Sequence, residues 1–279
     1  MDFDAHLNQT VNDMKANALP PVAPIVELAR QAASAILEVY DSEFAIQHKD
    51  DKSPLTAADM ASHRVILEGL RRLHPELPAL SEESAAIDFG ERNAWQRYWL
   101  IDPLDGTKEF IKRNGEFTVN IALIDRGEAV LGVVCVPVSG RVYYGVRGQG
   151  AWSQDADQAP EPIRVRARHG RPVQVAGSRS HAGDSLRRYL DNLGEHEIVS
   201  MGSSLKLCLV AEGRADLYPR LGPTSEWDTA AAQAVVEAAG GRVTDTAMQP
   251  LRYNTKDSLL NPHFFVFGDT AVDWSQYLE

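Results

Sequence analysis

Asp102 and Asp105 are the residues whose types and spacing most directly suggest chemistry. They stand three positions apart, just after the apolar run Trp99–Ile101. We expect that run to be a buried strand that Pro103 ends, with Gly106 allowing a turn. Placing two acids there is costly because like charges repel, and a divalent cation such as Mg²⁺, which prefers oxygen ligands and often keeps a substrate phosphate, removes that cost. A turn whose acids only cap a helix is the alternative.

The neighbouring residues favour a metal and phosphate site. If a helix begins at Gly106-Thr107, its unpaired backbone N–H groups can hold a phosphate, and Thr107 can hold or deprotonate a water. A plain N-cap is the alternative role for Thr107. Upstream, Glu82 and Glu83 form an acidic pair, which is usually an exposed loop. The presence of Asp102 and Asp105 makes a ligand role for the pair credible.

The second half of the chain offers a further carboxylate and several cations. Asp228 opens an alanine-rich segment, where it is either a first-turn acid or a ligand for the same metal cluster. Gly202–Lys206 starts another helix with small residues, hydroxyls and a lysine, which suits a second phosphate, although a serine N-cap is also ordinary. The other candidates for binding an anion are Arg179, His181 and Arg220.

Two helices and an antiparallel sheet should position the first group of residues. Apolar residues recur at helical spacing over 25–40, and a second helix should begin with Thr56 as N-cap and Asp59 in its first turn. Alternating patterns then predict a meander of strands, followed by a polar loop over 153–162. The expected strands are 99–101, 117–124, 129–136 and 141–146.

Strands and helices alternate in the second half, which predicts a mostly parallel or mixed sheet covered by helices. The expected helices are 184–193, 204–212 and 227–239, and the expected strands are 173–176, 198–199, 215–218, 242–244 and 264–267. We therefore divide the chain into a lead-in (1–21), an α+β domain with an antiparallel sheet and most metal ligands (22–165), and an α/β domain (166–279). The last domain supplies Asp228 and the substrate-binding residues.

Composition bounds the class of partner and the compartment. The formal net charge of −11 over 279 residues argues against a nucleic-acid polymer as partner, because its phosphates would be repelled. Cys135 and Cys208 lie in apolar runs and are expected in the core, with no disulfide framework. No apolar run is long enough to span a bilayer, and the acidic N-terminus lacks a signal core. We expect a cytoplasmic protein.

Three segments together resemble the inositol monophosphatase superfamily of lithium-sensitive, Mg²⁺-dependent phosphatases. They are Ser81-Glu82-Glu83, Trp99 to Thr107 with its Asp-Pro-Leu-Asp-Gly-Thr, and Glu226-Trp227-Asp228-Thr229-Ala230-Ala231. The resemblance covers about residues 20 to 270. Within the superfamily, Lys108-Glu109-Phe110 and Ser203-Ser204-Leu205-Lys206 resemble the bacterial 3'(2'),5'-bisphosphate nucleotidases. Ser225 and Ala232 depart from the usual pattern, at positions that are not ligands.

The resemblance implies a role for each matching residue. The metal ligands would be Glu82, Asp102, Asp105, Asp228 and the carbonyl of Leu104. Thr107 paired with Asp59 would orient the attacking water, with Glu82 also in the catalytic set. Gly106 and Thr107 would hold the scissile phosphate beside the metal ligands. The residues that would hold the nucleotide and its other phosphate are His181, Ser203, Lys206 and Arg220.

The implied fold is a layered αβαβα sandwich of the inositol monophosphatase and fructose-1,6-bisphosphatase type. The implied reaction is hydrolysis of 3'-phosphoadenosine 5'-phosphate to AMP and phosphate, linked to sulfate assimilation, with two or three Mg²⁺ ions and inhibition by Li⁺. The alternatives are an inositol or sugar-phosphate phosphatase and a non-catalytic nucleotide sensor. A monomer and a homodimer both stay open, as does peripheral attachment to the cytoplasmic face of the inner membrane.

Overall fold

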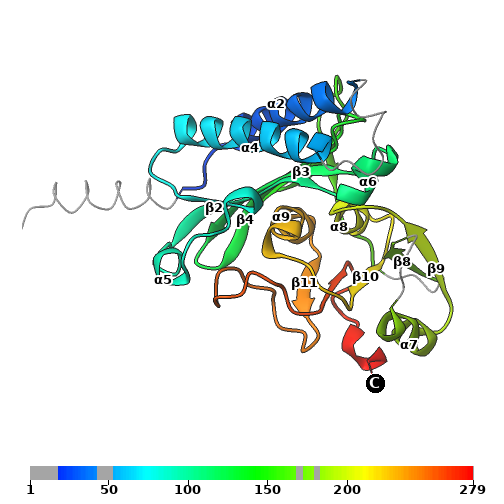
Figure 1. Cartoon of the computed structure of the whole chain (residues 1–279). Coiled ribbons are helices and arrows are strands. Elements are labelled where there is room, and N and C mark those ends of the chain that lie inside the picture. The colour runs from blue at the N-terminus through cyan, green and yellow to red at the C-terminus, as the bar shows by residue number, and fades with distance from the viewer. Residues whose placement is uncertain (1–17, 43–52, 168–171, 179–182, 279) are drawn as a thin grey trace, which may run out of the picture.

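The computed structural model describes residues 18–42, 53–167, 172–178 and 183–278. In it, two β-sheets alternate with layers of helices (Figure 1). From one side to the other, the layers are a helix pair, a seven-stranded sheet, two central helices, a five-stranded sheet and an outer helix. The predicted αβαβα sandwich is therefore confirmed. In the described part of the chain, no helix is long and apolar enough to cross a membrane.

The first layer is a pair of helices, α2 (Ala23–Tyr40) and α4 (Ser53–Leu73). The prediction that the second helix begins at Thr56 was wrong, because α4 begins three residues earlier. Proline is tolerated in the first turn of a helix, where its missing N–H would have no partner, so the Ser53-Pro54 step does not delay the start. Asp59 consequently lies in the second turn of α4 and not in the first.

The first sheet follows chain order from β1 to β7. β1 is parallel to β2, and the other neighbours are antiparallel, so the predicted antiparallel sheet has one parallel pair at its edge. Part of the predicted loop over 153–162 is also a strand, because β7 pairs with β6. The strands are β1 (Ala79–Ser81), β2 (Arg97–Asp105), β3 (Thr118–Asp125), β4 (Glu128–Cys135), β5 (Val142–Val146), β6 (Gly150–Gln154) and β7 (Glu161–Ile163).

The central strands are mainly apolar, apart from a few polar residues such as Asp102 and Asn120, because both faces of the sheet are covered. Along β2, Trp99 and Ile101 are buried in the cluster beneath α2 and α4, whereas Leu100 belongs to the cluster between the two sheets. Successive side chains of a strand point to opposite faces, so a strand covered on both sides reads as a continuous apolar run. Three short helices connect these strands: η1 (Glu82–Ser84), α5 (Phe89–Arg92) and α6 (Thr107–Lys112).

Helix α9 (Ala230–Ala238) lies between the sheets on a row of very small residues. Gly132 on β4 pairs with Gly145 on β5, and alanines continue the row on both sides. A Cβ atom added to Gly132 would lie 2.0 Å from the carbonyl oxygen of Ala231. The helix backbone therefore rests directly on the strands, which fixes its height above the sheet.

The second sheet is mixed, as predicted, with the order β11-β12-β10-β8-β9. β8 is parallel to both its neighbours, and β12 is antiparallel to both of its own. Helix α7 and η3 cover its outer face around Tyr189, Phe265 and Trp274. The elements are β8 (Val173–Gly177), α7 (Asp184–Leu193), β9 (His196–Ser200), α8 (Leu205–Ala211), β10 (Leu217–Arg220), η2 (Glu226–Asp228), β11 (Arg242–Asp245), β12 (Phe264–Phe267) and η3 (Trp274–Tyr277).

Candidate active site

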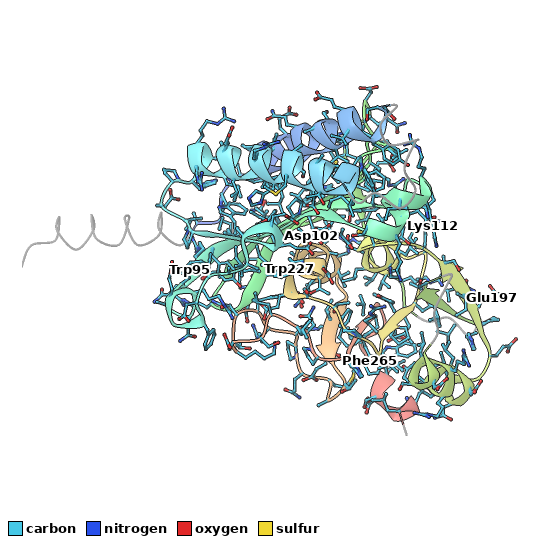
Figure 2. The ribbon with its side chains drawn as sticks, viewed as in Figure 1. Trp95, Asp102, Lys112, Glu197, Trp227 and Phe265 are labelled. Atoms are coloured by element: carbon cyan, nitrogen blue, oxygen red, sulfur yellow. The ribbon has the colours of Figure 1, made fainter. Side chains whose placement is uncertain are left out.

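A bulge in β2 brings Asp102 and Asp105 into one site. The prediction that the strand ends at Pro103 was wrong. Strand β2 continues to Asp105 with a shift of register. Asp102 pairs with Asn120 and Asp105 with Thr118, so three steps on β2 match two on β3. In a regular strand, residues three apart face opposite sides, and the extra residue of a bulge cancels that difference. Figure 2 shows Asp102 near the centre of the molecule, between the helix pair and Trp227.

Helix α4 brings Asp59 to the same place. The Ser62 hydroxyl donates a hydrogen bond of 2.8 Å to the carbonyl of Pro103 in the bulge. His63 Nδ1 lies 2.9 Å from Ser81 Oγ at the end of β1, one residue before Glu82. These two buried contacts tie α4 to both acidic segments. Among the described residues, Asp59 Oδ1 is buried without a hydrogen-bond partner, as expected where a water or cation belongs.

Asp228 reaches the site from the second half of the chain through a break in the predicted 227–239 helix. The regular helix begins only at Ala230, and Asp228 lies in the preceding turn, η2. Its Oδ2 atom accepts a hydrogen bond of 2.9 Å from the backbone N–H of Ser225. The carboxylate is thereby oriented before any ligand binds, and Ser225, which departs from the family pattern, takes part through its backbone.

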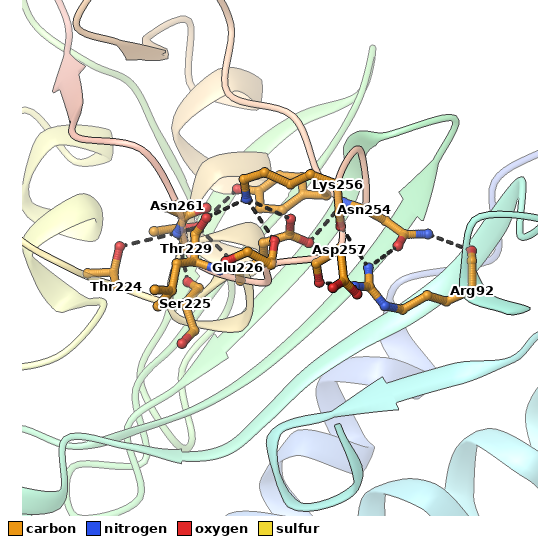
Figure 3. Close-up of polar contacts among 12 residues, drawn as sticks. Arg92, Thr224, Ser225, Glu226, Thr229, Asn254, Lys256, Asp257 and Asn261 are labelled. Carbon is orange, nitrogen blue, oxygen red and sulfur yellow. Dashed lines mark hydrogen bonds and ion pairs between the residues drawn. The ribbon is translucent and has the colours of Figure 1, made fainter. Parts of the chain in front are cut away.

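A polar network holds η2 in place (Figure 3). Asn261 Nδ2 donates to the Ser225 carbonyl at 2.7 Å and contacts the hydroxyls of Thr224 and Thr229. The buried carboxylate of Glu226 accepts from the backbone N–H of Asn254 at 2.9 Å. Asn254 in turn exchanges side-chain hydrogen bonds with Arg92. The sequence does not single out Arg92, Thr224, Asn254 and Asn261, because isolated polar residues in connecting segments carry no periodic signal.

The carboxylates of the site affect one another strongly. Burial raises the pKa of Asp228 to about 7, with the charge of Asp105 next in importance. Burial likewise raises the pKa of Asp59 to about 8, helped by the charges of Glu83 and Glu82. Burial raises the pKa of Asp102 well above its ordinary value, and the four further influences on it raise it too. Those influences are the charges of Asp105, Glu82, Asp228 and Asp59.

These residues fit a hard divalent cation by chemistry, although their side chains do not surround a common point. Within the described residues, no three Asp, Glu, His or Cys side chains are placed to hold an ion as they stand. The donors are nevertheless all oxygens, and the main charges acting on Asp102 are negative. A bound cation would relieve that repulsion and draw the carboxylates together. The residues available to hold it are Glu82, Asp102, the Leu104 carbonyl, Asp105 and Asp228.

A cavity of about 140 Å³ opens beside Asp105 and Asp228. Its walls bring together Ser203, Lys206 and Arg220, three of the residues predicted to bind the nucleotide and its second phosphate. Its lining includes both carboxylates and cations, which suits a metal-bound substrate with more than one anionic group. Tyr218 and Glu109 also line the cavity and were not predicted as site residues.

The residues that were predicted to bind the second phosphate are held by contacts with the backbone of their own segments. Ser203 has a left-handed backbone conformation, with φ of 45°. The buried Lys206 ammonium donates to the Ser203 carbonyl at 2.7 Å and to the Met201 carbonyl at 3.4 Å. Burial lowers the pKa of Lys206, and the carboxylate of Asp105 opposes that shift. Arg220 donates from Nη2 to the Pro223 carbonyl.

The remaining predicted residues are placed as follows. Gly106 has a φ of 103°, which favours glycine, and Thr107 begins the short helix α6 with its side chain exposed. Gly106 lines the cavity. No hydrogen bond between Thr107 and Asp59 is found among the described residues, and the principal charge acting on Asp59 is that of Glu83. His181 and Arg179 lie outside the described residues.

Comparison with known proteins identifies the family. The family model described as "Inositol monophosphatase family" matches residues 19–269. The chain belongs to this family. Inositol monophosphatase family members are generally metal-dependent phosphatases, and the family predicted from the sequence is confirmed.

Individual relatives are more specific. The chain is 54% identical to the 3'(2'),5'-bisphosphate nucleotidase CysQ of Salmonella typhimurium over 244 residues, 87% of this chain and 97% of the relative. It is 37% identical to the protein of the same name from Haemophilus influenzae, over 90% of this chain and 93% of the relative. The crystal structure of CysQ from Bacteroides thetaiotaomicron superposes with a TM-score of 0.80 at 41% identity, covering 88% and 96%. The predicted enzyme class, a phosphatase-type hydrolase, is that of these relatives.

Proposed function

We propose that this chain is a Mg²⁺-dependent phosphatase that hydrolyses the 3'-phosphate of 3'-phosphoadenosine 5'-phosphate to AMP and phosphate, a step linked to sulfate assimilation. The observation that carries the proposal is the cavity whose lining combines the metal-type oxygen donors Asp105 and Asp228 with Ser203, Lys206 and Arg220. Relatives over 50% identical are named as nucleotidases, which supports a nucleotide over an inositol phosphate. For compartment and oligomeric state we retain the sequence-based expectations of cytoplasm and of monomer or homodimer.

The mechanism divides between metal-holding and substrate-holding residues. Glu82, Asp102, the Leu104 carbonyl, Asp105 and Asp228 would hold two or three Mg²⁺ ions. When bound, Mg²⁺ supplies positive charge that acidifies a water and stabilises the leaving 3'-oxygen. Li⁺ can take one such position with too little charge to assist, so we expect it to inhibit.

The protein's own residues would orient the attacking water and transfer its proton. The Thr107 hydroxyl would orient the attacking water, and the backbone N–H groups of Gly106 and Thr107 would hold the scissile phosphate. Asp59 has a pKa raised to about 8 by burial and neighbouring carboxylates, which suits a group that accepts and returns a proton near neutral pH. His181, Ser203, Lys206 and Arg220 would bind the remainder of the nucleotide.

A substrate panel tests the proposal. Phosphate release should be measured from 3'-phosphoadenosine 5'-phosphate and from inositol 1-phosphate, with Mg²⁺, with EDTA, and with added Li⁺. We expect Mg²⁺-dependent, Li⁺-sensitive turnover that strongly favours the nucleotide. Preference for inositol 1-phosphate would replace the proposal with the inositol phosphatase alternative, and nucleotide binding without turnover would indicate a sensor.

A matched pair of variants links turnover to the site. Asp102→Asn should abolish turnover, because it removes a charged ligand from the centre of the cluster. Asp157→Asn, which changes an exposed acid in the turn between β6 and β7, should leave turnover unchanged. Near-normal activity of Asp102→Asn at saturating Mg²⁺ would contradict the assigned site.

A further inference from the structure

The loop Met201–Ser204, which joins β9 to α8, is anchored from both sheets. On its own side, the Met201 N–H donates to the Gly177 carbonyl at 3.0 Å, and the Lys206 ammonium donates to the Met201 and Ser203 carbonyls. The other anchors come from the region of the first sheet. The backbone N–H of Gly202 donates to Glu116 Oε2 at 2.8 Å. The next anchor is the backbone N–H of Ser204, which donates to Asp105 Oδ2 at 2.5 Å. The Ser204 hydroxyl lies 2.9 Å from both Asn120 Oδ1 and Thr118 Oγ1. On that side, the loop that carries Ser203 is therefore positioned by β2, by the segment that follows α6 and by β3.

Steric contact reinforces the anchor at Gly202. A Cβ atom there would lie 2.5 Å from Cγ of Glu109 and 2.8 Å from the carbonyl oxygen of Glu116. The loop is thus pressed against both glutamates at its second residue. The following residue, Ser203, has the left-handed φ of 45°, a conformation that persists only where the surroundings determine it strongly.

We propose that Glu116 is a positioning residue that sets the preference of the enzyme for bisphosphorylated substrates. The proposal rests on the proposed function, in which Ser203 and Lys206 bind the second phosphate. Glu116 is not among the residues that line the cavity, so it acts on the substrate through the loop. Without its acceptor oxygen, the Gly202 N–H loses its partner. The left-handed turn at Ser203 then loses the anchor that precedes it and keeps the Ser204–Asp105 and Lys206–Ser203 contacts. The contact with the proposed metal ligand Asp105 is made by Ser204, two residues along the loop, so we expect the side that holds the scissile phosphate to be affected less.

The charge of Glu116 also reaches Lys206, whose pKa it raises slightly against the effect of burial. An amide at position 116 separates this charge effect from positioning, because Glu116→Gln keeps an acceptor oxygen at similar reach and removes the charge. Glu116→Ala removes both, and Glu116→Asp keeps the charge but shortens the side chain by one methylene. Positioning predicts that the glutamine variant behaves like the wild type and that the other two do not.

The test compares KM and kcat for two substrates, 3'-phosphoadenosine 5'-phosphate and adenosine 3'-monophosphate, which lacks the second phosphate. For Glu116→Ala and Glu116→Asp we expect KM for the bisphosphate to rise about tenfold, the size of one lost hydrogen bond to a charged group. The kcat values and the KM for the monophosphate should change less than about threefold. Glu116→Gln should keep the wild-type preference between the two substrates.

Three outcomes would overturn the inference: equal losses for both substrates, a glutamine variant as impaired as the alanine variant, or an unchanged KM for the bisphosphate. If Glu116→Ala does not fold, the aspartate and glutamine variants still decide between positioning and charge. Absence of bisphosphate turnover by the wild-type enzyme would instead overturn the proposed function, and the inference with it. The wild-type measurement therefore separates the two failures.

Discussion

Helix α9 rests directly on the first sheet. A substitution at Gly132, which is not a proposed ligand, therefore tests how the sheet positions α9 and the turn that carries Asp228. In Gly132→Ala, the new Cβ would lie 2.0 Å from the Ala231 carbonyl oxygen. Cβ atoms essentially never come within 3.0 Å of a heavy atom outside their own and the adjacent residues. Helix α9 must therefore retreat by at least 1 Å or the strand must bend. The three nearest atoms are the O, C and Cα atoms of Ala231. All of them are backbone, so no side-chain rotation relieves the clash.

The expected effects follow from that displacement. Overpacking of a core costs about 1–3 kcal/mol, and in a chain of this size each kcal/mol lowers the unfolding temperature by about 2–4 °C. We therefore expect Gly132→Ala to unfold about 2–12 °C below the wild type. Because Asp228 lies in the turn that leads into α9, turnover should also fall, since a 1 Å misplacement of a reacting group can cost about 10²-fold.

A glycine without neighbours provides the matched control. At Gly183 an added Cβ meets nothing within 4 Å, and the backbone φ of −61° suits any residue. Gly183→Ala should change the unfolding temperature and kcat little. The assays are thermal unfolding followed by circular dichroism and steady-state phosphate release with Mg²⁺. If Gly132→Ala matched the control in both assays, the argument that α9 rests directly on β4 would be refuted.

Two further predictions concern the charges and the network of the site. Without divalent cations, stability should fall as pH rises through about 7 and 8, because the pKa values of Asp228 and Asp59 are raised in the folded state and the stabilisation from holding their protons is lost above them. Thermal unfolding below and above these pH values, in EDTA and in Mg²⁺, checks this, and equal stability in EDTA throughout would count against it. Separately, Asn261→Ala should lower the free energy of unfolding in urea by about 1–3 kcal/mol and should lower kcat. The substitution removes the Asn261 donor from the Ser225 carbonyl and from two hydroxyls. An unchanged kcat would show that this network does not position Asp228.

The acidic motifs could be found from the sequence because each carries its own local signal. Asp102 and Asp105 follow a continuous apolar run, and Asp228 precedes an alanine-rich one. Their convergence was an expectation of family resemblance, since nothing in the spacing specifies a bulge in β2. A proline after a strand usually marks its end, and here it lies inside the bulge. The interpretation of Pro103 as a terminator was therefore wrong for a physical reason that only pairing with β3 reveals.

The contacts that hold the site could not be predicted, because they join distant residues with ordinary local surroundings. Glu116 contacts a loop 86 residues away, and Asn254 exchanges hydrogen bonds with Arg92 across 162 residues. Each is a polar residue in a polar segment, where exposure is the default expectation. Glu109 was noted for its motif, but its place against Gly202 depends on how the two sheets pack. The predicted ligands therefore carry local signals in the sequence, whereas the residues that orient their segments do not.

The small residues of α9 show why stability alone does not explain this core. Larger apolar side chains at Ala231 and Ala234 would bury more surface and stabilise more strongly. They would also lift the helix from the row formed by Gly132 and Gly145, where backbone meets backbone. The turn carrying Asp228 would rise with it, away from Asp102 and Asp105 on the same sheet. The small residues on both sides of the contact set the distance of α9 from the first sheet and so place the Asp228 carboxylate. This placement explains them better than the packing that they provide.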